Sequence, residues 1–213
     1  SLSEDEKSKR PYPLISGDVG PYAAYLANGS EYTGDYGKIS KEELKDFHRP
    51  RIAILLKQGV DLLALETIPN ALEAEALVEL LAEEFPQVEA YISFTIQESS
   101  SISDGTSLEA MVELVDTSKQ ILALGINCSS PLLFDAALEK LASLTNKYLV
   151  TYPNSGEVYD GQTQTWKPKD VTAKNLREHS QAWHEQFQVK ILGGCCRTRP
   201  NDIKSLYQTF RDQ

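Results

Sequence analysis

The segment QILALGINC, residues 120–128, is a nearly continuous apolar run that ends in a cysteine. A second apolar run, VKILGGCC at residues 189–196, ends in two further cysteines. Short runs without polar alternation are typical of parallel strands that are buried on both faces. The two segments therefore predict a parallel sheet in which all three cysteines of the chain directly follow a strand.

Four more segments read as strands of the same sheet, and helical patterns separate them. The expected strands are PLIS (13–16), VDLLALE (60–66), EAYISFTI (89–96) and KYLVTYP (147–153). The expected helices are 71–84 with Asn70 as N-cap, 108–120 with Ser107 as N-cap, 132–144 with Pro131 in the first turn, and 173–187. Repeated strand–helix units predict an α/β fold with right-handed crossovers.

Two α/β architectures fit this pattern: an open doubly wound sheet and a (β/α)8 TIM barrel. A complete barrel has eight strands and typically about 250 residues, whereas six strands can be counted here. We favour an incomplete barrel because its rim collects the ends of strands that are far apart in sequence, such as those before Cys128 and Cys195. No linker-like segment divides the chain, so residues 1–213 are expected to form one domain.

Composition narrows the functional classes. The 213 residues carry a net charge of −10, which disfavours binding to nucleic acid or to anionic membrane surfaces and leaves small-molecule partners. No apolar run reaches the roughly 18 residues of a membrane span. Three cysteines, two of them adjacent, do not suggest a disulfide framework, so we expect a cytoplasmic protein. The polar start without a Met leads us to expect that the beginning of a longer protein is absent.

Three thiolates with an open fourth position would suit a catalytic zinc site, because structural zinc sites normally have four protein ligands. Two other interpretations stay open from the residues alone. Buried cysteines are common as small hydrophobic residues, and the CxxC spacing of many zinc sites is missing. Alternatively, Cys195 and Cys196 are a redox pair, although adjacent cysteines form disulfides poorly and Cys128 is then unexplained.

At this point the motifs resemble those of the homocysteine S-methyltransferase family. GINC (125–128) and GGCC (193–196) resemble its zinc-binding motifs, and residues 16–37, ALETIPN (64–70), YPNSGEVYD (152–160) and GGCCRTRP (193–200) match its blocks in order. The resemblance implies a (β/α)8 barrel that here lacks its first two βα units, including an Asp that helps to bind the homocysteine amino group. The nearest branch uses S-methylmethionine or S-adenosylmethionine.

The resemblance also implies a reaction and its ligands. Cys128, Cys195 and Cys196 would hold Zn²⁺, and L-homocysteine would bind as a thiolate at the fourth position. The thiolate would take a methyl group from the sulfonium donor, forming methionine. The partners of this enzyme would be these two small molecules. A non-catalytic zinc-binding fragment is the alternative, because the first strands of the barrel are missing.

Five further residues are candidates for substrate binding. Glu66 ends an apolar strand at the rim and is expected to bind the homocysteine ammonium, although it could instead favour the following helix N-terminus. The others are Asp18 in a Gly- and Tyr-rich loop with Tyr22, Ser93, Asn127 beside a predicted metal ligand, and Asn154. For Ser93, a hydroxyl bonded within the core fits as well. His48, His179 and His184 are expected at the surface or at element boundaries.

Overall fold

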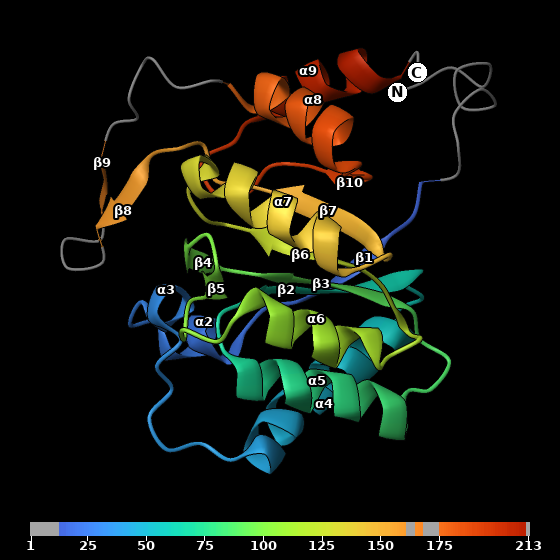
Figure 1. The fold of residues 1–213 in the computed structure, drawn as a ribbon. Helices are drawn as coiled ribbons and strands as arrows, with labels where there is room; N and C mark the ends of the chain where they lie inside the picture. Colours follow the sequence, from blue (N-terminus) through green and yellow to red (C-terminus); the bar gives the residue numbers. More distant parts are fainter. Residues whose placement is uncertain (1–12, 161–164, 168–174, 212–213) are drawn as a thin grey trace.

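A single parallel sheet organises the structure, a computed structural model that describes residues 13–160, 165–167 and 175–211 (Figure 1). Its six strands lie in the order β1-β2-β3-β6-β7-β10, and every neighbouring pair is parallel. The strands are β1 (Ser16–Val19), β2 (Leu62–Ile68), β3 (Ala90–Phe94), β6 (Ile121–Asn127), β7 (Tyr148–Tyr152) and β10 (Ile191–Leu192). The expected six-stranded parallel sheet is therefore confirmed.

Helices connect successive strands and cover one face of the curled sheet, which has the form of a half-barrel (Figure 1). They are α4 (Lys41–Lys57), α5 (Ala71–Glu84), α6 (Leu108–Asp116), α7 (Phe134–Leu144), α8 (Leu176–Phe187) and α9 (Pro200–Phe210), with the short α2 (Tyr22–Leu26), α3 (Ser30–Thr33) and η1 (Pro131–Leu133). Two hairpins were not predicted: β4 (Ile96–Glu98) with β5 (Ser101–Ile102), and β8 (Val158–Asp160) with β9 (Thr165–Lys167).

Local capping explains why most helix starts could be read from the sequence. The side chains of Asn70 and Ser107 accept hydrogen bonds from the N–H groups of Glu73 and Ala110, so both predicted N-caps are confirmed. Helix α6 is shorter than expected and ends at Asp116. The part of the expected helix before Asn175 includes residues outside the described ranges.

Several strand limits differ from the prediction: β2 is shifted by two residues from the expected 60–66, and β10 is only Ile191–Leu192 of the expected 189–194. Leu14 and Ile15, which were assigned to the first strand, are 68% and 59% exposed, and pairing with β2 begins only at Ser16. The segment 89–96 is not one strand, because β3 ends at Phe94 and the chain turns into the β4 hairpin. The carbonyl of Ile15 still accepts from the N–H of Asp61 at 2.8 Å, but its side chain, like that of Leu14, lies outside the core.

The prediction for the histidines is wrong for two of the three. His48 lies inside α4 and is fully buried. Its Nε2 has a polar partner there, the buried Glu73 carboxylate at 2.8 Å. Glu73 also accepts a 2.6 Å hydrogen bond from the N–H of Tyr22, which anchors the loop after β1 to α4 and α5. His179 is buried in α8, where its ring stacks on Trp183.

The core lies between the helices and the sheet. Leu63, Leu65, Ile92, Phe94 and Leu124 point from the strands into this layer and are fully buried. The opposite face of the sheet carries only a small apolar cluster of Ala123, Val150 and Tyr152. Among the described residues, every helix is too short or too polar to span a bilayer.

Candidate metal and substrate site

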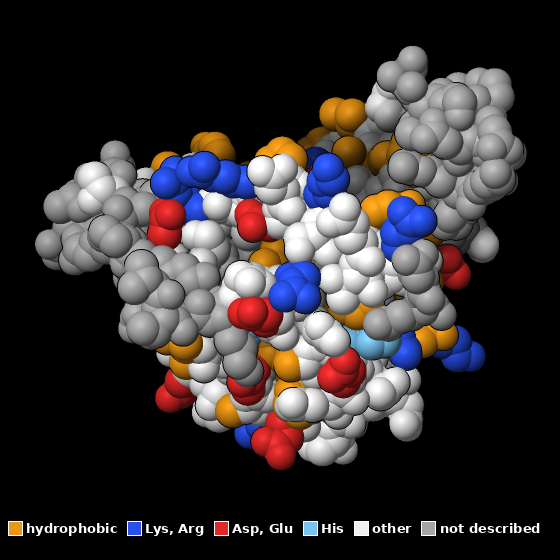
Figure 2. All heavy atoms as spheres, turned by 90° about the horizontal axis from the view of Figure 1, so that it is seen from above, with side chains coloured by type: hydrophobic (Ala, Val, Ile, Leu, Met, Phe, Trp, Pro, Cys, Tyr) orange, Lys and Arg blue, Asp and Glu red, His pale blue; other side chains and the backbone are white. Residues whose placement is uncertain are grey.

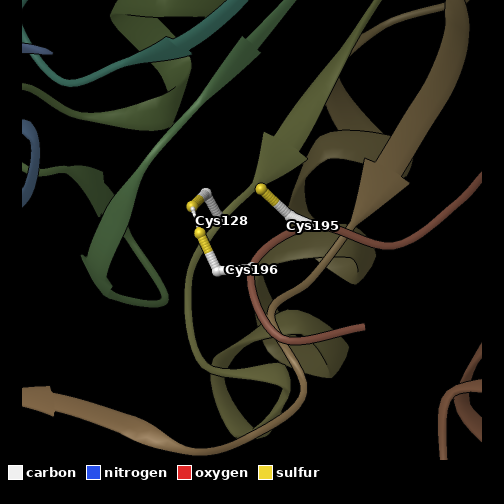
Figure 3. A group of neighbouring side chains, drawn as sticks. All are labelled: Cys128, Cys195 and Cys196. Carbon is white, nitrogen blue, oxygen red and sulfur yellow. Dashed lines mark hydrogen bonds between the residues drawn. The ribbon is translucent and has the colours of Figure 1, made fainter. Parts of the chain in front are cut away.

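Three cysteines meet at the carboxyl end of the sheet (Figure 3). Cys128 follows β6, and Cys195 and Cys196 follow β10, although β7 separates these strands. All three Sγ atoms lie within 4.8 Å of one another, and those of Cys128 and Cys196 are 3.4 Å apart. All three are free thiols. Among the described residues, no other set of three His, Cys, Asp or Glu side chains comes together in this way.

The end of β7 holds both cysteine segments in place. The N–H of Cys128 donates to the carbonyl of Tyr152 at 3.1 Å, and the N–H of Cys195 donates to that of Pro153 at 2.8 Å. The carbonyl of Cys196 accepts from the N–H of Ser155 at 2.9 Å. Cys128 has a positive φ of 48°, an unusual conformation that turns the chain sharply as it leaves β6.

A glycine allows the tight turn after β10. A Cβ atom at Gly194 would lie 2.6 Å from Thr198 Oγ1, and Thr198 itself donates to the carbonyl of Cys195 at 2.7 Å. Only a residue without a side chain fits this turn unless Thr198 moves. The second glycine of the GG before the cysteine pair therefore has a local structural reason.

The chemistry of this donor set fits zinc. Soft thiolates are the ligands that select zinc, and a tetrahedral site with Zn–S bonds of about 2.3 Å places its sulfurs about 3.8 Å apart. The observed sulfurs, 3.4 Å apart for Cys128 and Cys196 and all within 4.8 Å of one another, are close enough to bind one such ion. Hydrogen bonds from Cys128 and Cys195 hold the pKa of the Cys196 thiol well below its usual range, whereas hydrogen bonds within the cluster and burial raise the pKa of Cys128 and of Cys195. The cluster by itself therefore favours a single thiolate, on Cys196. The three sulfurs can bind one metal ion and leave one tetrahedral position for another ligand.

A second polar cluster lies on the open face of the sheet. The Glu66 carboxyl on β2 lies close enough to the Tyr152 hydroxyl on β7 and to the Asp18 carboxyl on β1 for both groups to influence its pKa. Tyr152 is in turn 2.6 Å from Ser93 Oγ on β3. Burial, with the neighbouring Asp18 charge, raises the pKa of Glu66 to about 7 even though the Tyr152 hydroxyl opposes the shift. The structure thus joins three of the predicted residues, Glu66, Asp18 and Ser93, in one network.

The two remaining candidates have mainly internal partners. Asn127 is fully buried, and both ends of its amide bond Thr67: Oδ1 accepts from the N–H at 3.0 Å and Nδ2 donates to Oγ1 at 2.8 Å. Asn154 is 8% exposed, and its Oδ1 accepts from the N–H of Gly156 at 3.1 Å. Asn154 thus shapes the loop after β7, whose carbonyls hold the cysteines.

The loop after β1 contributes a tyrosine that was not predicted. Burial and the charge of Cys128 raise the pKa of Tyr32, so this phenol lies in the electrostatic field of the sulfurs and stays protonated. Tyr22, the candidate from the same loop, packs instead against Phe47 and Tyr36 and lies with the Glu73 cluster. Arg197 forms an ion pair with Glu157 at 2.6 Å.

Sequence reasoning also missed Tyr152 and Thr67. Tyr152 was assigned to an apolar strand and to a family block but to no role, yet its hydroxyl contacts Ser93 and lowers the pKa of the neighbouring Glu66. Alternation along β7 signals this role, because Val150 and Tyr152 share the open face. Thr67 gave no comparable signal, since its contact with Asn127 spans sixty residues.

Comparisons with known proteins agree with the geometry. A family model described as homocysteine S-methyltransferase matches residues 3–210. Homocysteine S-methyltransferase 3 of Arabidopsis thaliana is 44% identical over 208 residues, which are 97% of this chain and 59% of that protein. Homocysteine S-methyltransferase of Escherichia coli K12 is 48% identical over 193 residues, 91% of this chain and 61% of that protein.

Solved structures give the same result. The metallated form of the homocysteine methyltransferase MmuM from Escherichia coli superposes with a TM-score of 0.83 at 43% identity, covering 96% of this chain and 64% of that one. The oxidized form of the same protein gives a TM-score of 0.82. The chain thus spans about 60% of the length of the curated relatives it matches.

Proposed function

The chain belongs to the homocysteine S-methyltransferase family, and from this premise we propose that it carries the site where a sulfonium donor methylates L-homocysteine. The observation that supports the proposal most strongly is the meeting of three sulfurs at the rim of the sheet. Relatives at 44–48% identity are named homocysteine S-methyltransferases. The small-molecule partners would be homocysteine and either S-methylmethionine or S-adenosylmethionine.

Zn²⁺ is the metal proposed for Cys128, Cys195 and Cys196. The all-sulfur donor set supports this choice, as does the metallated form of the related MmuM. When bound, zinc supplies an acidic centre that lowers the pKa of the homocysteine thiol and keeps it ionised at neutral pH. The cysteines are needed as thiolates, so we propose that the protein works in a reducing compartment such as the cytoplasm.

Glu66 and Asp18 are proposed to bind the homocysteine ammonium. Both carboxyl groups face the open side of the sheet, and together they form an acidic pair beside the hydroxyl of Tyr152. Ser93 contacts Tyr152 and fixes the direction of that hydroxyl. Since the raised pKa of Glu66 leaves it partly protonated near neutrality, binding of the ammonium would release its proton. Asn154 is proposed to shape the rim against which homocysteine lies.

The methyl transfer itself needs no proton movement once the thiol is ionised. The homocysteine sulfur forms a bond to the methyl carbon, and the bond from that carbon to the sulfonium sulfur breaks. The electron pair of the broken bond stays on the donor sulfur, which leaves as a neutral thioether. The residues of this chain would therefore act by positioning two substrates in line. With S-methylmethionine as donor, both products are methionine.

For the whole fold we propose a (β/α)8 barrel in which residues 1–213 belong to one homocysteine-binding domain. Two features support this. Strands β1 and β10 are the edges of the sheet, each paired on one side only. Beside β10, a cavity of about 560 Å³ is lined by Leu192, Leu206 and Phe210 among others, away from the cysteines. Hydrophobic side chains also reach the surface on this α8–α9 side (Figure 2), where Ile203 and Tyr207 are about half exposed.

We propose that two further βα units, preceding β1 in the barrel order, pair with both edges. The partial coverage of the relatives agrees with this, since the chain spans 59–64% of them. The same observations favour one alternative function, in which the chain alone binds zinc and homocysteine without transferring a methyl group. Edges left open would make such a piece prone to association.

Two measurements on the purified chain test the proposal. We expect about one zinc per chain by elemental analysis, and methionine formation from L-homocysteine with S-methylmethionine or, in a parallel reaction, S-adenosylmethionine. The donor with the larger kcat/KM identifies the branch. Zinc and homocysteine binding without methyl transfer would establish the binding role instead. A chain that takes up no zinc under reducing conditions would contradict both functions.

A further inference from the structure

Asn127 and Thr67 form a closed side-chain contact next to both parts of the site. Asn127 is fully buried at the end of β6, and both the carbonyl and the amino group of its side chain are hydrogen-bonded to Thr67. Thr67 follows Glu66 directly, and Asn127 precedes Cys128 directly. One pair of hydrogen bonds, of 3.0 and 2.8 Å, therefore joins the residue beside the proposed ammonium ligand to the residue beside a proposed metal ligand.

The contact bridges strands that are not neighbours. Strand β3 lies between β2 and β6, so the Asn127 side chain reaches across the end of β3. The ladder between β2 and β3 is irregular between Leu65 and Ile68, which frees the N–H of Thr67 from the sheet. Asn127 supplies the acceptor that this N–H has lost.

The backbone of Thr67 gives a second, independent observation. Its φ is +64°, a left-handed conformation that a β-branched residue rarely adopts. Such strain persists only where surrounding contacts fix it, and it concentrates at functional sites. Cys128 also has a positive φ, of 48°. Each arm of the site therefore contains a left-handed residue, Thr67 near the end of β2 and Cys128 directly after β6, and the Asn127–Thr67 contact joins the two segments.

We propose that Asn127 is a positioning residue that, through Thr67, sets the direction of Glu66 relative to Cys128. It thereby keeps a constant spacing between the ammonium-binding carboxylate and the metal-binding sulfurs, which a substrate with an amine at one end and a thiol at the other must span. The inference rests on the proposed function for its substrate. A change at Thr67 on β2 should therefore alter metal binding, although Thr67 is not a proposed metal ligand.

Thr67→Val tests this claim, because valine keeps the shape of threonine and removes the hydroxyl. Thr67 is on a different strand from every cysteine, yet we expect the variant to bind Zn²⁺ about 10-fold more weakly, the scale seen when partners of metal ligands are removed. Thr151→Val is the matched control. It removes a buried hydroxyl of the neighbouring β7 that donates to the Ile126 carbonyl at 3.1 Å, and zinc affinity should stay within about twofold. Competition against a chromophoric chelator measures both.

Rescue by glycine separates positioning from general damage. Asn127→Ala should weaken zinc binding about 10- to 100-fold, because Thr67 then relaxes from its strained conformation. Glycine adopts positive φ freely, so Asn127→Ala combined with Thr67→Gly should regain part of the loss. The KM for homocysteine should rise in the variants in which zinc affinity falls, and it should fall again in the double variant. Equal zinc affinities for the parent chain, Thr67→Val and Asn127→Ala would overturn the inference.

A metal-free readout keeps this inference distinct from the proposed function. In the chelated chain, the alkylation rate of Cys128, followed by mass spectrometry, should rise several-fold in Thr67→Val and stay unchanged in Thr151→Val. If the parent chain binds no zinc, the proposed function fails while this comparison still tests the contact. Equal rates in both variants would show that Thr67 has no influence on Cys128.

Discussion

The face of the sheet that the helices cover and the face that they leave open are built by alternate residues of the same strands. On β3, Ile92 and Phe94 point into the covered layer, whereas Tyr91 and Ser93 point to the open side. The covered face is a continuous apolar core. The open face gathers carboxyl, phenol and hydroxyl groups close enough to shift one another's pKa, and the phenol and hydroxyl of Tyr152 and Ser93 are hydrogen-bonded.

This difference separates stability from chemistry. Burial of the covered face contributes most of the folding free energy, at about 25 cal/mol per Å² of apolar surface. The open face buries few apolar side chains, so it can hold polar groups that a core would not tolerate without partners. Substitutions on the two faces should therefore fail in different assays, and this distinction can be tested.

The largest effect is expected at the sulfurs. Cys196→Ala removes one of three proposed ligands. Since zinc binding to a four-ligand site is worth roughly 10–16 kcal/mol, or about 2.5–4 kcal/mol per ligand, the loss of one ligand should weaken it by about two to three orders of magnitude. Zinc content and a chelator competition measure this. The apolar core is untouched, so the thermal unfolding of the metal-free chain should hardly change. Retained stoichiometric zinc would remove Cys196 from the ligand set.

Leu80→Ala makes the converse change on the covered side. Leu80 is fully buried in α5, within the apolar core. Its truncation should lower the free energy of unfolding by about 2–5 kcal/mol, through lost burial and the remaining cavity. Zinc bound per folded molecule should stay the same, as judged at a temperature where the variant is folded. A specific loss of zinc in this variant would show that the two faces are not independent.

Gly125 lies in β6 between Leu124 and Ile126 of the covered core, and Gly125→Ala should have an intermediate effect. A Cβ atom there would lie 1.7 Å from the carbonyl oxygen of Val150, so β6 and β7 would have to separate. Overpacking of this kind costs about 1–3 kcal/mol, and the shift should also loosen Cys128. Gly193→Ala is the matched control, because its Cβ would meet only Tyr152 Cβ at 3.4 Å, an ordinary contact. Denaturant unfolding of both variants gives the comparison.

The sequence predicted what depends on local pattern. The strand 121–127 and the caps Asn70 and Ser107 follow from apolar runs and from hydrogen bonds within three residues. The meeting of Cys128 with the later pair followed from one topological rule, that parallel strands end at the same edge. Resemblance to a family then selected zinc from the remaining interpretations.

What the sequence did not predict depends on contacts between distant segments. Helix α4 was missed because it contains Pro50 and many charged residues, yet His48 within it is buried against Glu73 from α5. The Asn127–Thr67 contact requires a bulge in β2, which no local pattern announces. The raised pKa of Glu66 likewise arises from burial and Asp18, which the fold brings together from another strand.

The smallest expected effect is the pH dependence that Glu66 adds to stability. Its pKa rises from 4.5 to about 7 on folding. Between these values Glu66 holds a proton in the folded chain that it releases in the unfolded chain. The contribution of Glu66 to stability is therefore highest below pH 4.5 and is lost as pH rises through about 7. Glu66→Gln keeps the neutral form at every pH. It should therefore melt at the same temperature as the parent chain near pH 5 and about 2–4 °C higher near pH 8, since partial exposure reduces the effect.

Glu113→Gln supplies the control for this last comparison, because it removes one negative charge from an exposed position on α6, on the helix-covered side. If both variants shift the melting temperature alike at pH 8, the effect is one of net charge, and the open face has no special influence on Glu66. If only Glu66→Gln melts above the parent chain at pH 8, the ionised Glu66 beside Asp18 lowers the free energy of unfolding of the parent chain. A carboxylate kept under such strain is favourably placed to gain from a cationic ligand, so L-methionine, which carries the ammonium but no thiol, should reduce the difference between the parent chain and Glu66→Gln at pH 8.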